Sequence, residues 1–183
     1  MKPIEDLKSE HEEILLMLDV LEKMSEQIVV GKSVPTDHLK QVIDFFQVFA
    51  DNYHHGKEER LLFGAMEEAG VPKEGGPLAV MLSEHGRGRQ FIGEMKNLLD
   101  SYEKGELGAL VVLTTPALQY VNLLRSHIWK ENDLLFPMAE KAVPAAKLEL
   151  IGDQFDNFEK KETGQGSHEA FHEMIEKFSK IYL

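Results

Sequence analysis

Apolar residues recur along this chain at alternating steps of three and four positions, and the period-two alternation of strands is hard to find. Four long runs of this helical pattern cover about residues 4–28, 36–69, 78–102 and 106–142, and two shorter runs cover about 145–161 and 167–182. Segments containing glycine or proline separate the runs, as expected for helices joined by turns. The pattern predicts an all-α fold: an antiparallel up-down four-helix bundle over about residues 4–142, with extra C-terminal helices over about 144–182.

Two prolines interrupt the fourth run. Pro116 and Pro137 both lie inside a stretch that is otherwise helical in pattern. A proline inside a helix removes one backbone hydrogen bond and crowds the preceding turn, so we expect a kink or break at each.

Composition narrows the classes of protein. The 183 residues are 43% hydrophobic, enough for one substantial core, and we expect a single domain over residues 1–183. The start of the chain lacks an apolar export segment, and no stretch approaches the roughly 18 apolar residues of a membrane span. The net charge of -12 argues against nucleic acid or an anionic membrane as a partner. We therefore expect a cytoplasmic protein that binds neither.

These 183 residues contain no cysteine. Disulfides, thiolate zinc sites, cysteine-held iron–sulfur clusters and thiol catalysis are therefore excluded for this chain. A metal could be held only by His, Asp or Glu side chains.

The sequence repeats itself in two short motifs. Ser9-Glu10-His11 reappears as Ser83-Glu84-His85, and His54-x-x-x-Glu58-x-x-Leu61-Leu62-Phe63 reappears as His127-x-x-x-Glu131-x-x-Leu134-Leu135-Phe136. The four long helices therefore form two helical hairpins of similar design, which can pack as a bundle with approximate two-fold symmetry. Such symmetry suits a pair of metal ions.

Six polar residues of these motifs occupy the apolar stripes of the four helices: His11, His54, Glu58, His85, His127 and Glu131. At about 1.5 Å of rise per residue, antiparallel packing brings all six to one height in the bundle. The i,i+4 spacing of each His-x-x-x-Glu pair keeps both side chains on one helix face. Buried carboxylates without a partner are costly and would take up protons, so bound divalent cations would remove a large penalty.

An imidazole and carboxylate site suits iron, manganese or zinc, and carboxylate-bridged bundles usually hold two iron or manganese ions. The order and spacing of these residues resemble the hemerythrin-like, HHE cation-binding family over about residues 4–137. The resemblance implies a non-haem di-iron centre in which Glu58 and Glu131 bridge the irons and the four histidines cap them, with an oxygen atom completing the bridge.

Two departures separate this chain from the oxygen-carrying hemerythrins that it resembles. Those carriers have a second histidine in the third helix, at the position of Arg89, and their last helix uses a spacing one residue longer that ends in Asp. These differences disfavour reversible oxygen carriage. The resemblance instead implies a metal- and oxygen-binding protein rather than an enzyme. Such a protein binds or senses dioxygen, nitric oxide or peroxide, or handles iron.

The last helical run contains His168-Glu169-Ala170-Phe171-His172, which fits the His-Glu-x-x-His pattern of zinc proteases. A zinc-dependent hydrolase with Glu169 as general base is therefore an alternative, although little chain follows to supply a third ligand. A metal-free structural bundle is another. We favour a helix that folds back on the bundle with His168 as an additional metal ligand, and leave open whether His172 or His55 adds one. His55 should point about 100° away from His54, toward solvent or a helix interface.

Overall fold

The computed structural model describes residues 2–162 and 167–183; the side chains of residues 156, 159–162, 167 and 168 are not described. Helices make up most of this part of the chain, and it contains no strand. The α-helices are α1 (Lys2–Val29), α2 (Thr36–Phe45), α3 (Phe63–Glu68), α4 (Pro77–Glu103), α5 (Ala109–Lys130), α6 (Phe136–Ala142), α7 (Ala145–Glu162) and α8 (Ser167–Tyr182). Three π-helical segments join some of them: η1 (Phe46–His55), η2 (Glu58–Leu62) and η3 (Glu131–Leu135). The predicted all-α fold is confirmed.

Glycines end the first three long helical segments where the sequence predicts. Gly31, Gly70 and Gly105 each have a positive φ, which an L side chain rarely adopts. Around each glycine the same two backbone hydrogen bonds close the last turn, as in Gly31 N to Ile28 O and Lys32 N to Gln27 O. This is the Schellman arrangement, which satisfies carbonyls at a helix end and turns the chain toward the next helix.

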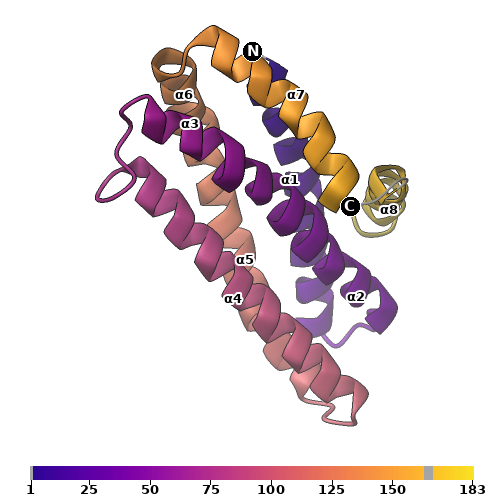
Figure 1. Ribbon diagram of the computed structural model, residues 1–183. Helices are drawn as coiled ribbons and strands as arrows, with labels where there is room; N and C mark the ends of the chain where they lie inside the picture. The colour runs from indigo at the N-terminus through magenta and orange to yellow at the C-terminus, as the bar shows by residue number, and fades with distance from the viewer. Residues whose placement is uncertain (1, 163–166) are drawn as a thin grey trace.

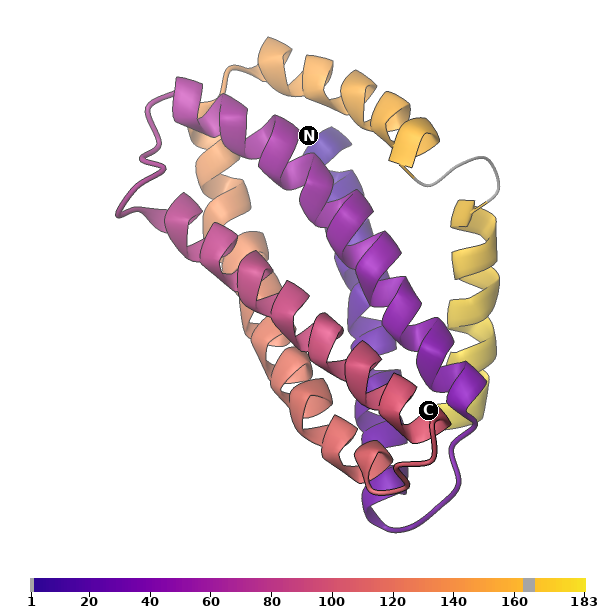
Figure 2. The same cartoon turned by 60° about the horizontal axis from the view of Figure 1, so that its bottom comes forward.

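Four helical segments lie side by side in a ring (Figures 1 and 2). They are α1, the continuous run from α2 to α3, α4, and the run from α5 to α6. α1 contacts α5 and the α2–η1 run, and α4 contacts the same two neighbours from the opposite side. α7 packs along α1, η1 and η2, whereas α8 packs along α1 farther down the bundle.

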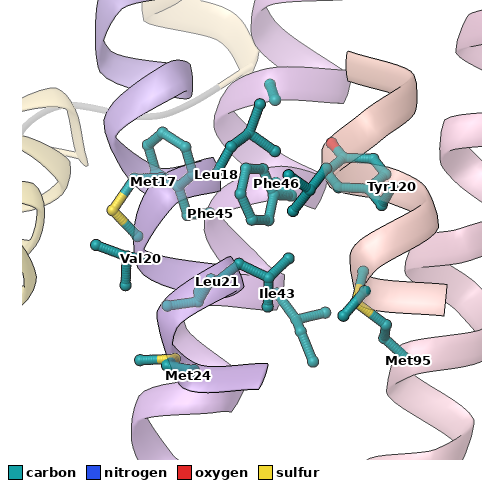
Figure 3. Close-up of a cluster of buried hydrophobic side chains, with 14 of the residues drawn as sticks. Met17, Leu18, Val20, Leu21, Met24, Ile43, Phe45, Phe46, Met95 and Tyr120 are labelled. Carbon is teal, nitrogen blue, oxygen red and sulfur yellow. The ribbon is translucent and has the colours of Figure 1, made fainter. Parts of the chain in front are cut away.

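Two apolar clusters fill the interior and leave a layer between them. The larger one includes Leu18, Phe46 and Tyr120, with the rings of Phe46 and Tyr120 4.9 Å apart between α5 and the α2–η1 run (Figure 3). The smaller cluster lies toward α6 and α7 and includes Leu7 and Leu62. The candidate metal ligands fall between the two clusters along each helix, so apolar packing closes the layer from both ends.

The two interior prolines behave differently. α5 continues from Ala109 to Lys130 through the buried Pro116, so a break at this position is wrong. One lost hydrogen bond is offset by the packing of α5 against α1 and α4. Pro137 lies in the first turn of α6, where its missing N–H is not needed, and the π-helical η3 precedes it.

The long helices are amphipathic, with buried residues on the side that faces the bundle. No helix within residues 2–162 and 167–183 has the length and apolarity needed to cross a bilayer.

Phe46 tests the larger cluster because its ring is fully buried. We expect Phe46→Ala to lower the free energy of unfolding by about 3–5 kcal/mol through lost burial and the cavity left behind. Urea unfolding followed by circular dichroism measures this change. Val112→Ala, at a position 55% exposed, is the control and should change the free energy by no more than about 0.5 kcal/mol. A loss below about 1 kcal/mol for Phe46→Ala would contradict the packing described here.

Candidate metal centre

The layer between the apolar clusters brings together six of the seven predicted ligands. His11 comes from α1, His85 from α4 and His127 from α5, while His54 is the last but one residue of η1 and the two glutamates begin η2 and η3. Each of the six is at most 1% exposed. The π-helical turns at these positions were not predicted. Such turns hold one more residue than an α-helical turn and occur often at functional sites.

The four imidazoles form two pairs with their inner nitrogens facing each other. His11 Nε2 and His54 Nε2 lie 2.9 Å apart, and His85 Nε2 and His127 Nε2 lie 3.0 Å apart. Two nitrogens bound at right angles to one ion, each at about 2.1 Å, would be about 3.0 Å apart. Each pair therefore has the spacing of two imidazoles that share one metal ion.

Each glutamate reaches both imidazole pairs. The two oxygens of Glu131 lie 3.2 Å from His11 Nε2 and 3.1 Å from His127 Nε2. Those of Glu58 lie 3.6 Å from His54 Nε2 and 3.6 Å from His85 Nε2. Within the part of the chain that the structure describes, none of these four buried oxygens accepts a hydrogen bond. Buried carboxylates are normally hydrogen-bonded or bound to metal, so this donor set fits a pair of cations.

The two carboxylates have opposite pKa shifts. Burial, together with the nearby charge of Glu131, raises the pKa of Glu58 well above its usual range. Burial also disfavours ionisation of Glu131, but the imidazoles of His127 and His11 outweigh it and hold its pKa well below its usual range. Without a cation, burial thus favours the protonated form of Glu58 more than that of Glu131, whereas a bound cation would favour the ionised form of both.

An outer ring of hydrogen bonds orients the imidazoles, and it follows the sequence repeat. His54 Nδ1 donates to Glu10 at 2.8 Å, and His127 Nδ1 donates to Glu84 at 3.0 Å. The other two contacts cross between the hairpins. His11 Nδ1 donates to Asn132 at 2.9 Å, and His85 Nδ1 donates to Glu59 at 2.7 Å. These oxygens fix the tautomer that leaves Nε2 free for a metal, and sequence reasoning missed their role although Glu10 and Glu84 lie in the repeated motifs.

A lysine pairs with each of the two glutamates that accept a hydrogen bond from a histidine of their own hairpin. Lys57 pairs with Glu10, and Lys130, at the equivalent position of the second repeat, pairs with Glu84. Lys57 is only 1% exposed and lies over the ring of Phe155 from α7, whereas Lys130 reaches the surface. Burial raises the pKa of Glu10, but its hydrogen bonds and charge interactions with His54 and Lys57 lower it to about 2.

α7 covers the side of the centre next to His54. Its Phe158 approaches the backbone between His55 and Lys57, and a Cβ atom added to Gly56 would lie 3.0 Å from that ring. A glycine at position 56 therefore allows α7 to pack against η1 and η2.

His54 and His127, which each donate a hydrogen bond to a glutamate of their own hairpin, differ in charge. Burial and the neighbouring imidazole of His11 lower the pKa of His54 to about 4. Burial also opposes protonation of His127, but the carboxylates of Glu131 and Glu84 raise its pKa to about 9. In the metal-free protein at neutral pH, His54 is neutral and His127 carries a proton.

His55 does not face solvent. It is 3% exposed, and its ring stacks on that of His85 with centroids 3.9 Å apart. Burial and the nearby imidazoles of His85 and His127 lower the pKa of His55 well below its usual value, so the ring is neutral. Of the two positions expected for this side chain, solvent or a helix interface, the structure shows the second, against His85 of α4.

Of the two C-terminal histidines, His172 alone has a side chain that the structure describes. His168 lies outside the residues whose side chains the structure describes, so its role as a ligand stays a prediction. His172 is half exposed and its Nε2 lies 3.4 Å from Glu13. Neither of the two groups of potential ligands found among the described residues includes a residue of α8. The zinc-hydrolase alternative depends on His168 as well, so it stays an untested alternative.

Comparison with known proteins gives a consistent picture. Residues 2–139 match the model of the hemerythrin HHE cation binding domain. The chain is 29% identical over 131 residues to the iron-sulfur cluster repair protein YtfE of Edwardsiella ictaluri, covering 70% of this chain and 59% of that protein. The YtfE protein of Dickeya chrysanthemi is 32% identical over 88 residues, 47% of this chain and 40% of that protein.

An uncharacterized protein of Mycobacterium tuberculosis is 21% identical over 177 residues, 97% of this chain and 68% of that protein. The chain thus spans less than two thirds of the Edwardsiella relative and about two thirds of the mycobacterial one. Since the family model matches most of its length and the ligand geometry accords with cation binding, the chain belongs to the hemerythrin HHE cation-binding family.

Proposed function

We propose that the chain holds two iron ions, capped by the four paired histidines and bridged by Glu58 and Glu131. One observation carries this proposal: each buried carboxylate spans both imidazole pairs, and its oxygens accept no hydrogen bond from the described residues. The donor set of imidazole and carboxylate suits iron, manganese or zinc, and iron is favoured because two relatives carry iron-sulfur cluster repair in their names.

A bound iron pair supplies redox chemistry toward a small ligand such as dioxygen, nitric oxide or peroxide. The protein's own residues hold and orient the imidazoles through Glu10, Glu84, Glu59 and Asn132. The apolar clusters above and below the layer, together with α7, exclude water from the carboxylates. Such a closed and preorganised layer suits binding or sensing of a small molecule.

Handling of iron is the second candidate function. The two YtfE relatives are named for repair of iron-sulfur clusters, which makes iron transfer a candidate for this chain. Without cysteine the chain has no thiolate to hold a cluster, so a cluster would be a substrate carried by another protein. Iron content and response to small ligands must therefore be measured on the same preparation.

One prediction of this proposal concerns metal content. Protein expressed in iron-replete medium should contain about two irons per chain. Glu58→Ala should lose both metals because its carboxylate spans the two imidazole pairs, whereas His11→Ala should mainly weaken one. Elemental analysis of the purified variants, with absorption spectra under dioxygen and nitric oxide, measures both effects.

His172→Ala is the matched control, since this imidazole faces Glu13 away from the centre and its loss should leave metal content unchanged. One zinc per chain without iron or manganese would refute the proposal, and full metal occupancy in Glu58→Ala would refute the bridging role.

The second prediction concerns pH. Metal binding must displace the proton of His127, whose pKa is about 9. The apparent affinity for iron should therefore rise with pH between about 6 and 8, by about tenfold per pH unit for each proton displaced. Anaerobic titration with ferrous iron against a competing chelator measures this slope.

Glu84→Gln provides the comparison. It removes one of the carboxylates that raise the pKa of His127, so the slope should become shallower while the affinity falls about 10- to 100-fold. An affinity independent of pH in the parent protein would contradict protonation of His127 in the metal-free state.

A further inference from the structure

The inner side of η1 presents two adjacent histidines to the centre. His54 is fully buried and His55 is 3% exposed, although neighbours on an α-helix would diverge by about 100°. η1 is π-helical and has more residues per turn, so neighbouring side chains diverge by a smaller angle. We propose that His55 is a third imidazole ligand on the side formed by His85 and His127, so that the two metal positions differ in their ligands. The inference rests on the proposed metal-binding function.

The first support is proximity. One potential ligand atom from each of His55, Glu58, His85 and His127 can be chosen so that all four lie within 4.8 Å of one another. The rings of His55 and His85 are nearly parallel, at an interplanar angle of 14°, and the ring of His127 lies edge-on to His55 at 5.4 Å. One nitrogen of each of the three imidazoles thus lies close to the same point as an oxygen of Glu58. The opposite group consists of His11, His54, Glu58 and Glu131.

The second support is the asymmetry of the repeat. His55 follows His54, and the equivalent residue after His127 is Ile128, which is also 3% exposed. Both positions are buried to the same degree, yet only one carries a nitrogen donor. If the position served packing alone, an apolar residue such as the one in the second repeat would avoid burying a polar ring.

The third support is the environment of the outer nitrogen. His55 Nδ1 lies 3.4 Å from Asp51 Oδ1, one turn earlier. Asp51 is held in turn by Arg89, whose Nε lies 2.8 Å from Oδ1 and 3.1 Å from Oδ2. The four paired histidines also direct Nδ1 to an oxygen outside the centre and leave Nε2 inside. Asp51 and Arg89 are positioning residues that leave Nε2 of His55 for the metal.

The test compares the parent protein with His55→Phe, which keeps a flat ring against His85 and removes both nitrogens. Each protein is loaded anaerobically with ferrous iron alone and studied by iron titration and Mössbauer spectroscopy. The parent should show two distinct iron environments. In His55→Phe one of the two irons should bind at least about 10- to 100-fold more weakly, the loss that even an outer hydrogen-bond partner causes. The signal of that iron should change while the other persists.

Ile128→Phe is the matched control, because it places the same ring at the equivalent buried position without removing a nitrogen. It should leave both iron environments in place. Circular dichroism checks the fold, and His55→Gln repeats the comparison should the larger ring disturb it. His55 variants with unchanged affinities and unchanged spectra would overturn the inference alone. A parent protein that binds no iron pair would overturn the proposed function as well.

Discussion

Two carboxylates deep in an apolar interior, with imidazole nitrogens against their oxygens and no other hydrogen-bond donor among the described residues, are the constraint on which the rest of this structure depends. Glu58 and Glu131 are fully buried, and ionised groups in such a place are unfavourable unless positive charge compensates them. The four imidazoles approach from all four helical segments of the ring, so the compensation requires every segment to hold its height and rotation. The two apolar clusters provide that rigidity from either side of the layer.

The two sides of the centre are supported by the same kinds of residue but differ in exposure. Glu10 and Lys57 form a buried pair beneath α7, whereas Glu84 and Lys130 form an equivalent pair that is partly exposed. The close approach of Phe158 to Gly56 brings the α7 cover against the first side. Solvent therefore reaches the outer hydrogen bonds of His127 more readily than those of His54, which makes the second side the more accessible one.

The sequence was sufficient to predict the helices and the six clustered ligand candidates, because helical periodicity and a duplicated motif can both be read from the order of the residues. It was insufficient for contacts that depend on rotation between helices. Asn132 and Glu59 directly follow Glu131 and Glu58 in sequence, yet nothing in a single helix shows that they reach the opposite hairpin. For His55 the sequence left solvent and a helix interface open, and it gave no sign of the π-helical turn that places this ring against His85 of α4.

The exchange of hydrogen bonds between the hairpins has a consequence for how such a chain can arise. His11 of the first hairpin is oriented by Asn132 of the second, and His85 of the second is oriented by Glu59 of the first. A single hairpin would contain its two histidines but would lack the side chain that accepts the Nδ1 hydrogen bond of one of them. Two identical hairpins associated about a two-fold axis would supply that partner to each other. The arrangement is thus that of a symmetric homodimer whose two subunits have been joined into one polypeptide.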